Sequence, residues 1–403
     1  MNVLFVTWDG PQVSYMESLF LPIFSRLASF GINFHILQFS WGDSNIFERR
    51  HQLCEEANCS YHIIKVRKKV PIFGNLFALL QGVHYLRKAF RKLDIDAVLP
   101  RSTLPALISL IAIRGFSQKL IFDADGLPLD ERVDFGGLAA NGKIYRFLRD
   151  IEASAVRKAD LVLTRSNAAT NILLARAGAG CSAEKVHVVF NGRDSTLFNS
   201  GNAESRARIR QELGIDAGVP LVAYVGSLGP QYCVSEMIAL FERIVSRCDG
   251  SHFLVLTGSP DLMLSVLKNY PQISKLVTVM SVPGNQVAQY LSSADLGLAF
   301  REYTFSMQAV APIKLGEYLL CGVPVVATNG IGDSHFIDEE AGLLVDSNDP
   351  ETFEAVSDWL FNQVIPRRND FRNHCRLVGV KHFSLESSVD AYRKALESIQ
   401  DKL

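Results

Sequence analysis

A repeated alternation of short β-rich runs, turns and helical patterns is the feature that most constrains the fold of this chain. The run NVLFVT at 2–7 ends in the turn Asp9-Gly10-Pro11, a helical pattern follows over 15–27, and NFHILQF resumes as a β-rich run at 33–39. This order of strand, turn, helix and strand is the repeating unit of a parallel sheet with right-handed crossovers. The same rhythm continues through the β-rich runs at 97–100, 119–124, 160–166 and 186–192.

The second half of the chain starts the alternation again at 221–229, and β-rich runs follow at 252–258, 276–282, 295–300 and 324–328. Because 403 residues are more than one hydrophobic core usually organises, we predict an α/β fold of two doubly wound, Rossmann-like domains. The expected parts are an N-terminal domain at 1–195, a C-terminal domain at 196–382, and a closing helix at 383–403 that packs back on the first domain. Ligands bind at the carboxyl ends of such strands, so the domains are expected to face an interdomain cleft.

Composition excludes several classes of protein. The chain has 41 Lys+Arg and 42 Asp+Glu, a balance that argues against a nucleic-acid partner. Its seven cysteines are scattered and contain no Cys-x-x-Cys pair, which is typical of a reduced, intracellular protein. The longest apolar run, Leu104–Ile113, is far shorter than the roughly twenty residues that cross a bilayer, and the start MNVLFVTWDG is unlike a signal peptide. We therefore expect a cytoplasmic protein.

The segment APIKLGEYLLCGVPVVATNG at 311–330 carries the strongest local signal of a binding site. Pro312 suits the first turn of a helix, where free backbone N–H groups can hold an anion, and Lys314 adds a positive charge for a phosphate. Glu317 lies on the same helix face, where a carboxylate can accept hydrogen bonds from the two hydroxyls of a ribose. The alternative is an exposed Lys–Glu pair on a surface helix, but the flanking proline and the following strand favour the binding site.

Pro-x-Lys-x-x-Glu-Tyr followed by Gly-x-Pro-Val-Val resembles the donor-nucleotide segment of retaining glycosyltransferases of the GT-B fold, in family 4. The stretches FDADG at 122–126, FNGRDSTLF at 190–198, YVGSLG at 224–229 and FSLE at 383–386 resemble the same family. The resemblance covers almost the whole chain. It implies transfer of a sugar from a nucleotide-sugar donor to a saccharide or lipid-linked acceptor, with retention of configuration and without a metal or other cofactor. A step in surface polysaccharide synthesis is the expected role.

The resemblance also implies roles for single residues of the C-terminal domain. Glu317 would bind the donor ribose and Lys314 its diphosphate. Gly226 and Ser227, in the turn after the first strand of this domain, would let backbone N–H groups approach the diphosphate. The alternative for this turn is that the glycine serves only the geometry of the fold.

Two features depart from the family pattern. Many members carry a glutamate eight positions before the ribose-binding one, and Ala309 stands there, which leaves the identity of the donor sugar open. Many also carry an arginine and a lysine in the turn where this chain has Ser227 and Gln231-Tyr232-Cys233. Lys314, together with Arg301, would then have to supply the positive charge that a departing diphosphate needs. For Arg301, a solvated loop charge is the alternative.

Three residues of the N-terminal domain are candidates for the acceptor side. Gly10 follows the first strand, where a turn without a side chain would admit the acceptor or the donor phosphates, or would simply serve the turn geometry. Asp123 and Asp125 end a strand that is expected to face the cleft. Asp125 could orient or deprotonate the acceptor hydroxyl, while a helix-capping or turn role is the alternative for both aspartates.

The segment 65–92 is unusually basic. It contains eight Lys and Arg residues and no acidic one, with apolar residues interleaved between 72 and 80. Such a segment suits an anionic membrane surface, so we predict a peripheral contact with the inner face of a membrane, where a lipid-linked acceptor could be reached. A basic surface helix without a partner is the alternative.

Two other functions remain open at the level of the sequence. One is a different GT-B enzyme, such as a nucleotide-sugar epimerase, which would need acid and base groups beyond Asp123, Asp125 and Glu317. The other is a catalytically silent protein that binds a nucleotide sugar, suggested by Ala309. The nine histidines show no metal-ligand spacing, so we predict no metal site.

Overall fold

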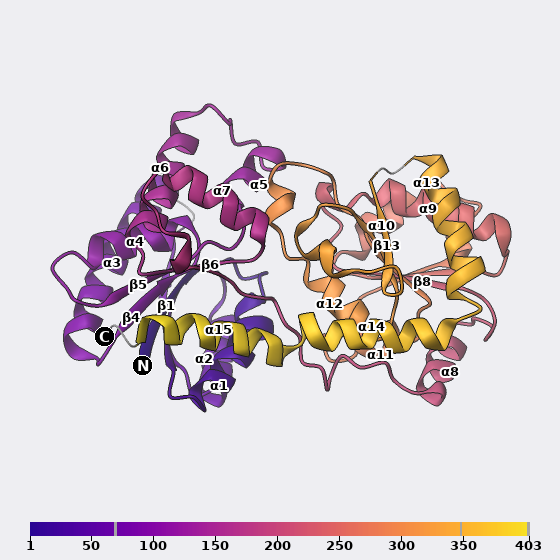
Figure 1. The fold of residues 1–403 in the computed structure, drawn as a ribbon, viewed down its shortest axis with the longest axis horizontal. Coiled ribbons are helices and arrows are strands. Elements are labelled where there is room, and N and C mark those ends of the chain that lie inside the picture. The colour runs from indigo at the N-terminus through magenta and orange to yellow at the C-terminus, as the bar shows by residue number, and fades with distance from the viewer. Residues whose placement is uncertain (68–70, 347–348, 401–403) are drawn as a thin grey trace. The chain divides into compact units, whose positions relative to one another are not determined.

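The computed structural model describes residues 1–67, 71–346 and 349–400, and the chain forms two compact units (Figure 1). The first consists of Met1–Phe190 with Ser388–Leu403, and the second of Asn191–Ser387. Each unit has one parallel β-sheet covered by helices on both faces. The two α/β domains that the alternation predicts are thus present.

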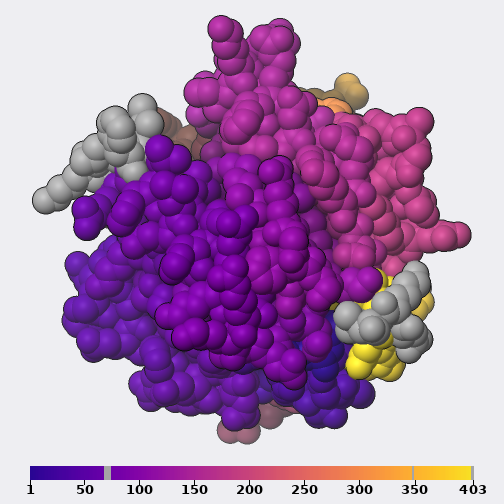
Figure 2. Space-filling view, turned by 90° about the vertical axis from the view of Figure 1, so that its left-hand side faces the viewer, coloured from indigo at the N-terminus to yellow at the C-terminus, as the bar shows by residue number. Residues whose placement is uncertain are grey.

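The first unit contains a seven-stranded sheet of order β3-β2-β1-β4-β5-β6-β7. Its strands are β1 (Asn2–Trp8), β2 (Asn33–Ser40), β3 (Ser60–Lys65), β4 (Ala97–Pro100), β5 (Lys119–Asp123), β6 (Leu161–Thr164) and β7 (Val186–Val188). Its helices are α1 (Leu21–Ala28), α2 (Ser44–Glu56), α3 (Pro71–Lys92), α4 (Thr103–Ala112), α5 (Pro128–Asp134), α6 (Lys143–Lys158) and α7 (Asn167–Ala177), and most of α15 (Leu385–Gln400) belongs to it. Figure 2 shows one face of this unit, with purple surface, from the part of the chain near residue 100, at its middle.

The second unit contains a six-stranded sheet of order β10-β9-β8-β11-β12-β13. Its strands are β8 (Leu221–Val225), β9 (His252–Leu256), β10 (Val277–Met280), β11 (Leu296–Ala299), β12 (Val325–Thr328) and β13 (Gly342–Val345). Its helices are α8 (Ala203–Glu212), α9 (Val234–Arg247), α10 (Pro260–Leu267), α11 (Val287–Leu291), α12 (Ile313–Leu320), α13 (Pro350–Trp359) and α14 (Arg368–Phe383). The central strands are buried on both faces and therefore read as continuous apolar runs.

Each sheet reverses its strand order once, and this reversal fixes where a ligand can bind. In the first unit it lies between β1 and β4, and in the second between β8 and β11. At such a point the segments after the two strands diverge to opposite faces and leave a crevice at the carboxyl edge. The segments that begin at Asp9, Arg101, Gly226 and Phe300 follow these four strands directly.

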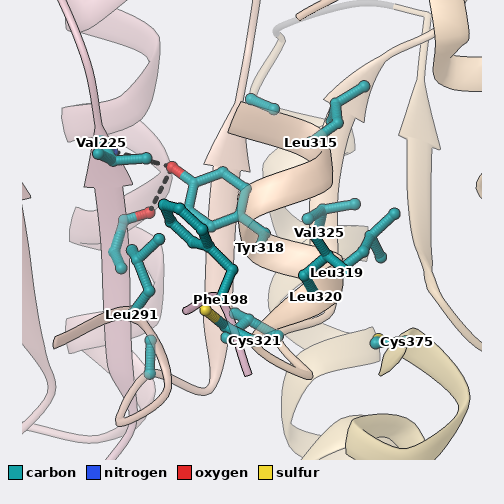
Figure 3. Packing of buried hydrophobic residues seen from close by; sticks show 14 of the residues in the cluster. Phe198, Val225, Leu291, Leu315, Tyr318, Leu319, Leu320, Cys321, Val325 and Cys375 are labelled. Carbon is teal, nitrogen blue, oxygen red and sulfur yellow. Dashed lines mark hydrogen bonds between the residues drawn. The ribbon is translucent and has the colours of Figure 1, made fainter. Parts of the chain in front are cut away.

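The core of the second unit anchors α12 beside this crevice. In Figure 3, Tyr318 points from α12 toward β8, where its hydroxyl accepts a hydrogen bond from the Val225 N–H at 3.0 Å. The same hydroxyl donates to the Leu298 carbonyl on β11 at 3.1 Å. Gly297 on β11 makes room for the ring, because a Cβ atom there would lie 2.7 Å from it. The helix is thus held against the two strands that flank the reversal.

Candidate functional site

The candidate site of the second unit is built on the short helix α12. Pro312 occupies the N-cap position, one residue before the place in the first turn that the sequence pattern predicts. The apolar residues Leu315, Leu319 and Leu320 are buried in the core and fix the rotation of the helix. That rotation turns Lys314 and Glu317 toward other charged and polar groups of the unit.

Lys314 is buried, with 8 % of its surface exposed. Its Nζ donates to the Tyr224 hydroxyl at 2.8 Å and lies 4.0 Å and 4.4 Å from the ring centroids of Tyr224 and Tyr232. The Tyr224 hydroxyl in turn donates to the Ser227 carbonyl. Burial, and next the positive charge of Arg301, hold the pKa of Lys314 well below its usual range.

Arg301 supplies a second buried cation at the same point. It follows β11, and its guanidinium carbon lies 4.5 Å from the centroid of the Tyr232 ring. Its Nη1 contacts the Met307 sulfur at 3.7 Å, and its backbone N–H donates to the Thr328 hydroxyl at 3.0 Å. With 8 % of its surface exposed, Arg301 is not the solvated loop charge that was the alternative. Tyr232 therefore lies against both cations.

The glycine turn after β8 lies next to Lys314. Gly226 has φ +125°, a conformation that favours glycine, and a Cβ atom built there would lie 3.4 Å from the Lys314 Nζ. Ser227 takes part through its carbonyl group, which accepts from Tyr224. The turn thus brings backbone groups to the buried ammonium, as a site for an anion requires.

Glu317 has a partner that the sequence analysis missed. Its Oε1 lies 3.0 Å from the Nε of Arg193, and 12 % of the Glu317 side chain is exposed. Burial raises the pKa of Glu317, and the charges of Arg193 and Lys314 oppose that rise. Because Glu317 is largely covered and Lys314 bonds to Tyr224, the interpretation of an exposed Lys–Glu pair is wrong.

In the first unit, Asp125 is held by another arginine that the sequence analysis missed. Arg101, directly after β4, places its Nη2 2.5 Å from Asp125 and its Nη1 3.4 Å from Asp9. Asp125 adopts the left-handed conformation, with φ +53°, in the turn after β5. Its side chain remains 28 % exposed, so this carboxylate can still reach a ligand.

Asp123 lies beneath this turn and is fully buried. Its carboxylate contacts the Nη2 of Arg165 at 2.6 Å and accepts from the Asp125 backbone N–H at 3.1 Å. Burial raises the pKa of Asp123, and Arg165 opposes the rise. Asp123 therefore supports the turn that carries Asp125, as in the alternative given for it above.

Gly10 packs against a tryptophan. A Cβ atom at this position would lie 2.9 Å from the Trp41 ring, so the close approach of the turn to the indole requires glycine.

Among the described residues, no group of three or more His, Cys, Asp or Glu side chains is placed to hold a metal ion. In the same part of the chain, no helix is long and apolar enough to cross a membrane.

Comparisons with known proteins agree with this architecture. Residues 205–377 match the family model of Glycosyl transferases group 1, and residues 20–197 match that of Glycosyltransferase Family 4. The alpha-maltose-1-phosphate synthase of Mycolicibacterium smegmatis is 26 % identical over 268 residues, which cover 62 % of this chain and 67 % of that protein. The D-inositol 3-phosphate glycosyltransferase of Segniliparus rotundus is 28 % identical over 224 residues, 53 % of this chain. This match spans 48 % of that relative, or about half its length.

A solved structure extends the likeness to the whole fold. The complex of Anabaena Alr3699/HepE with UDP-glucose matches with a TM-score of 0.68 and 17 % identity, and the match covers 100 % of both chains. Its fold is thus shared from end to end, and the two family models together account for both units. The chain therefore belongs to the glycosyltransferases of family 4, the glycosyl transferases group 1, and has the GT-B fold.

Proposed function

We propose that this protein transfers a sugar from a nucleotide-sugar donor to a saccharide or lipid-linked acceptor, with retention of configuration, as a step in surface polysaccharide synthesis. The observation that carries the proposal is the pair of buried cations, Lys314 and Arg301, at the carboxyl edge of the second sheet. Among the described residues, neither forms an ion pair with a carboxylate. Two buried charges in this state favour an anion, and the diphosphate of a nucleotide sugar supplies one.

The same residues suit the chemistry of sugar transfer. When the bond between the sugar and the diphosphate breaks, negative charge grows on the departing phosphate oxygen. A buried ammonium and guanidinium stabilise that charge more strongly than solvated groups would. We assign to Glu317, one turn further along α12, the role of accepting hydrogen bonds from the ribose of the same nucleotide.

Asp125 of the first unit is the proposed acceptor-side group. It is partly exposed, and its ion pair with Arg101 fixes its direction. In the front-face attack that the family resemblance implies, the acceptor oxygen forms the new bond to the sugar while the departing phosphate oxygen takes the acceptor proton. Asp125 then needs only to orient the acceptor hydroxyl and does not have to remove its proton.

Two of the similar proteins support parts of the proposal. Alr3699/HepE was solved with UDP-glucose, which supports a nucleotide sugar as the donor. The Mycolicibacterium relative is named for a sugar phosphate, which supports a saccharide-type acceptor. The choice of uridine as the base, and of one donor sugar, is left to experiment.

The direct test is a thermal-shift screen of UDP, GDP and ADP, followed by turnover of the matching nucleotide sugars with and without acceptor saccharides. A ligand at a hundredfold its Kd stabilises the folded state by about 2.7 kcal/mol, so the correct nucleotide gives a clear shift. Binding followed by acceptor-dependent transfer supports the proposal. Donor consumption without an acceptor would point to an epimerase or hydrolase, and binding without turnover to a silent binding protein.

The exposed side of α3 supports a peripheral membrane contact, which we propose as well. Leu76, Phe77 and Leu80 are 52 %, 49 % and 62 % exposed. Arg67 lies 5.7 Å from the Phe77 ring, and exposed basic residues continue to the end of the helix. Within the predicted segment 65–92, Lys68 and Lys69 lie outside the described residues. Apolar side chains beside basic ones suit the interface of an anionic bilayer.

Vesicle co-sedimentation tests this contact. The triple variant L76S/F77S/L80S should lose binding to vesicles of phosphatidylglycerol and phosphatidylcholine. The control L262S/L264S changes two similarly exposed leucines of α10 and should bind as the parent does. Equal sedimentation of both variants, or no binding of the parent at low salt, contradicts the proposal.

A further inference from the structure

We propose that Arg193 is the positioning residue of the donor site, and that it holds the Glu317 carboxylate in place to accept the two ribose hydroxyls. This inference rests on the proposed function, because it assigns a role around the same nucleotide. It concerns a residue of the segment that connects the two units and not a residue of α12. Nothing in the donor motif at 311–330 points to it.

The contact between the two side chains is direct and mostly covered. The Arg193 Nε lies 3.0 Å from the Glu317 Oε1, and the side chains are 15 % and 12 % exposed. The Arg193 guanidinium carbon also lies 4.8 Å from the centroid of the buried Phe198 ring. The aromatic face therefore restricts where the guanidinium can lie, and the guanidinium restricts the carboxylate.

The backbone of Arg193 is held just as firmly. Its N–H donates to the Phe383 carbonyl at 2.9 Å, and its carbonyl accepts from the Leu385 N–H at 2.8 Å. The chain passes from one unit to the other after Phe190 and again after Ser387. Arg193 thus lies where the two connecting segments are bonded to each other, close in sequence to both passages. These two backbone hydrogen bonds fix the position of the Arg193 Cα atom, from which its side chain extends toward Glu317.

The charge of Arg193 favours the ionised form of Glu317, and the two ribose hydroxyls need this ionised form as their hydrogen-bond acceptor. A carboxylate accepts at two oxygens, whereas a protonated carboxyl group gives up part of that capacity. Burial favours the protonated form of Glu317 and raises its pKa, and the nearby charges of Arg193 and Lys314 oppose that rise. Tyr318 of α12 and Cys321, the residue that follows this helix, also interact electrostatically with Glu317 and add no positive charge. Without Arg193, the ionised form of the buried Glu317 carboxylate would lose the positive charge that contacts it directly.

Titrations of two nucleotides against five proteins separate a loss of positioning from a loss of folding. Calorimetric titrations compare UDP with 2′,3′-dideoxy-UDP, which lacks both ribose hydroxyls, for the parent protein, R193M, R193K and E317Q. Methionine keeps an unbranched side chain and removes the guanidinium charge, and R208M, at an exposed position of α8, is the control. GDP or ADP and its dideoxy form replace UDP if the thermal-shift screen selects that base.

We expect R193M to weaken UDP binding at least tenfold and dideoxy-UDP binding less than threefold, and R193K to recover part of the loss. An equal loss for both nucleotides, or no loss, overturns the role of Arg193. The E317Q arm tests the proposed function separately. If E317Q binds both nucleotides as the parent does, the ribose assignment fails. If E317Q loses UDP selectively while R193M does not, only the inference about Arg193 fails.

Discussion

At the scale of single residues, Lys314 is the most informative group of the protein. Its ammonium lies against two tyrosine rings and donates to a phenol, inside a region that excludes most water. Burial disfavours the charged form of this amine until an anion approaches it. In the proposed function, the approach of the diphosphate stabilises the charged form of Lys314.

The first prediction replaces this charge. Lys314→Met keeps the length of the side chain and removes the ammonium, so nucleoside diphosphates should no longer raise Tm and kcat/KM should fall by roughly 100-fold or more. The free protein should unfold at the same or a higher temperature, because the variant buries an apolar side chain in place of an amine whose charged form burial disfavours. Lys268→Met, at an exposed lysine of the same unit, should change neither quantity. Nucleotide-induced stabilisation of the Lys314 variant would refute the assignment.

The second prediction concerns protons. Burial holds the pKa of Lys314 well below its usual range, and a bound diphosphate favours the charged form and raises it. Binding should therefore take up protons, and affinity should fall as pH rises from the pKa of the free site toward that of the complex. Calorimetry over a range of pH in which the diphosphate is already ionised, in buffers of different ionisation enthalpy, would measure the uptake. Heats that are independent of the buffer would argue against this account.

The residues that sequence analysis found and missed differ in one respect. Lys314 and Glu317 lie three positions apart on one helix, so their spacing predicts that they share one face of that helix. Arg193 and Arg101 reach their carboxylates from segments far away in the sequence, at 317 and 125. A charged residue directly after a buried strand, as Arg101 is, was the one local signal available. Pairing at such distances depends on the tertiary fold, which a spacing rule does not contain.

At the scale of elements, the sequence predicts the central strands of each sheet better than the edge strands. The apolar runs of β1, β4, β8 and β12 were identified, because strands buried on both faces are continuous in hydrophobicity. The edge strands β3 and β13 were missed. Exposed and half-buried positions alternate in β3 (Ser60–Lys65), which leaves only a weak apolar signal.

The third prediction belongs to α12. Tyr318→Phe removes the hydroxyl that bonds Val225 and Leu298, and leaves the Val225 N–H without that acceptor. The free energy of unfolding should fall by about 1–3 kcal/mol, the cost of an unsatisfied buried group. Denaturant unfolding measures it, and the 66 % exposed Tyr303, changed to phenylalanine, is the control. If the two variants are equally stable, the hydroxyl does not anchor the helix.

At the scale of the whole molecule, the C-terminal helix joins a unit that is distant in sequence. From Ser388 onward α15 belongs to the first unit, where Tyr392 is buried. Burial raises the pKa of Tyr392, and the charge of Arg165 opposes that rise. The first unit is therefore complete only when the end of the chain is in place. The residues proposed for the donor site all belong to the second unit, so α15 and the proposed donor site can be perturbed separately.

The fourth prediction uses this separation. Leu396→Ala, at a fully buried position of α15, should lower the free energy of unfolding by about 2–5 kcal/mol. The affinity for UDP at 20 °C should not change, because the nucleotide residues lie in the other unit. Leu377→Ala, at a 68 % exposed position of α14, should be nearly neutral. A large loss of UDP affinity in the folded Leu396 variant would show that the donor site depends on the first unit.

The central claim, that α12 holds the donor nucleotide, is tested most directly by a crystal structure of the protein with UDP. The account predicts the diphosphate within hydrogen-bond distance of the Lys314 Nζ and near the Arg301 guanidinium, with both ribose hydroxyls on the Glu317 carboxylate. A nucleotide bound elsewhere, with Lys314 still bonded only to Tyr224 and Glu317 only to Arg193, would contradict it.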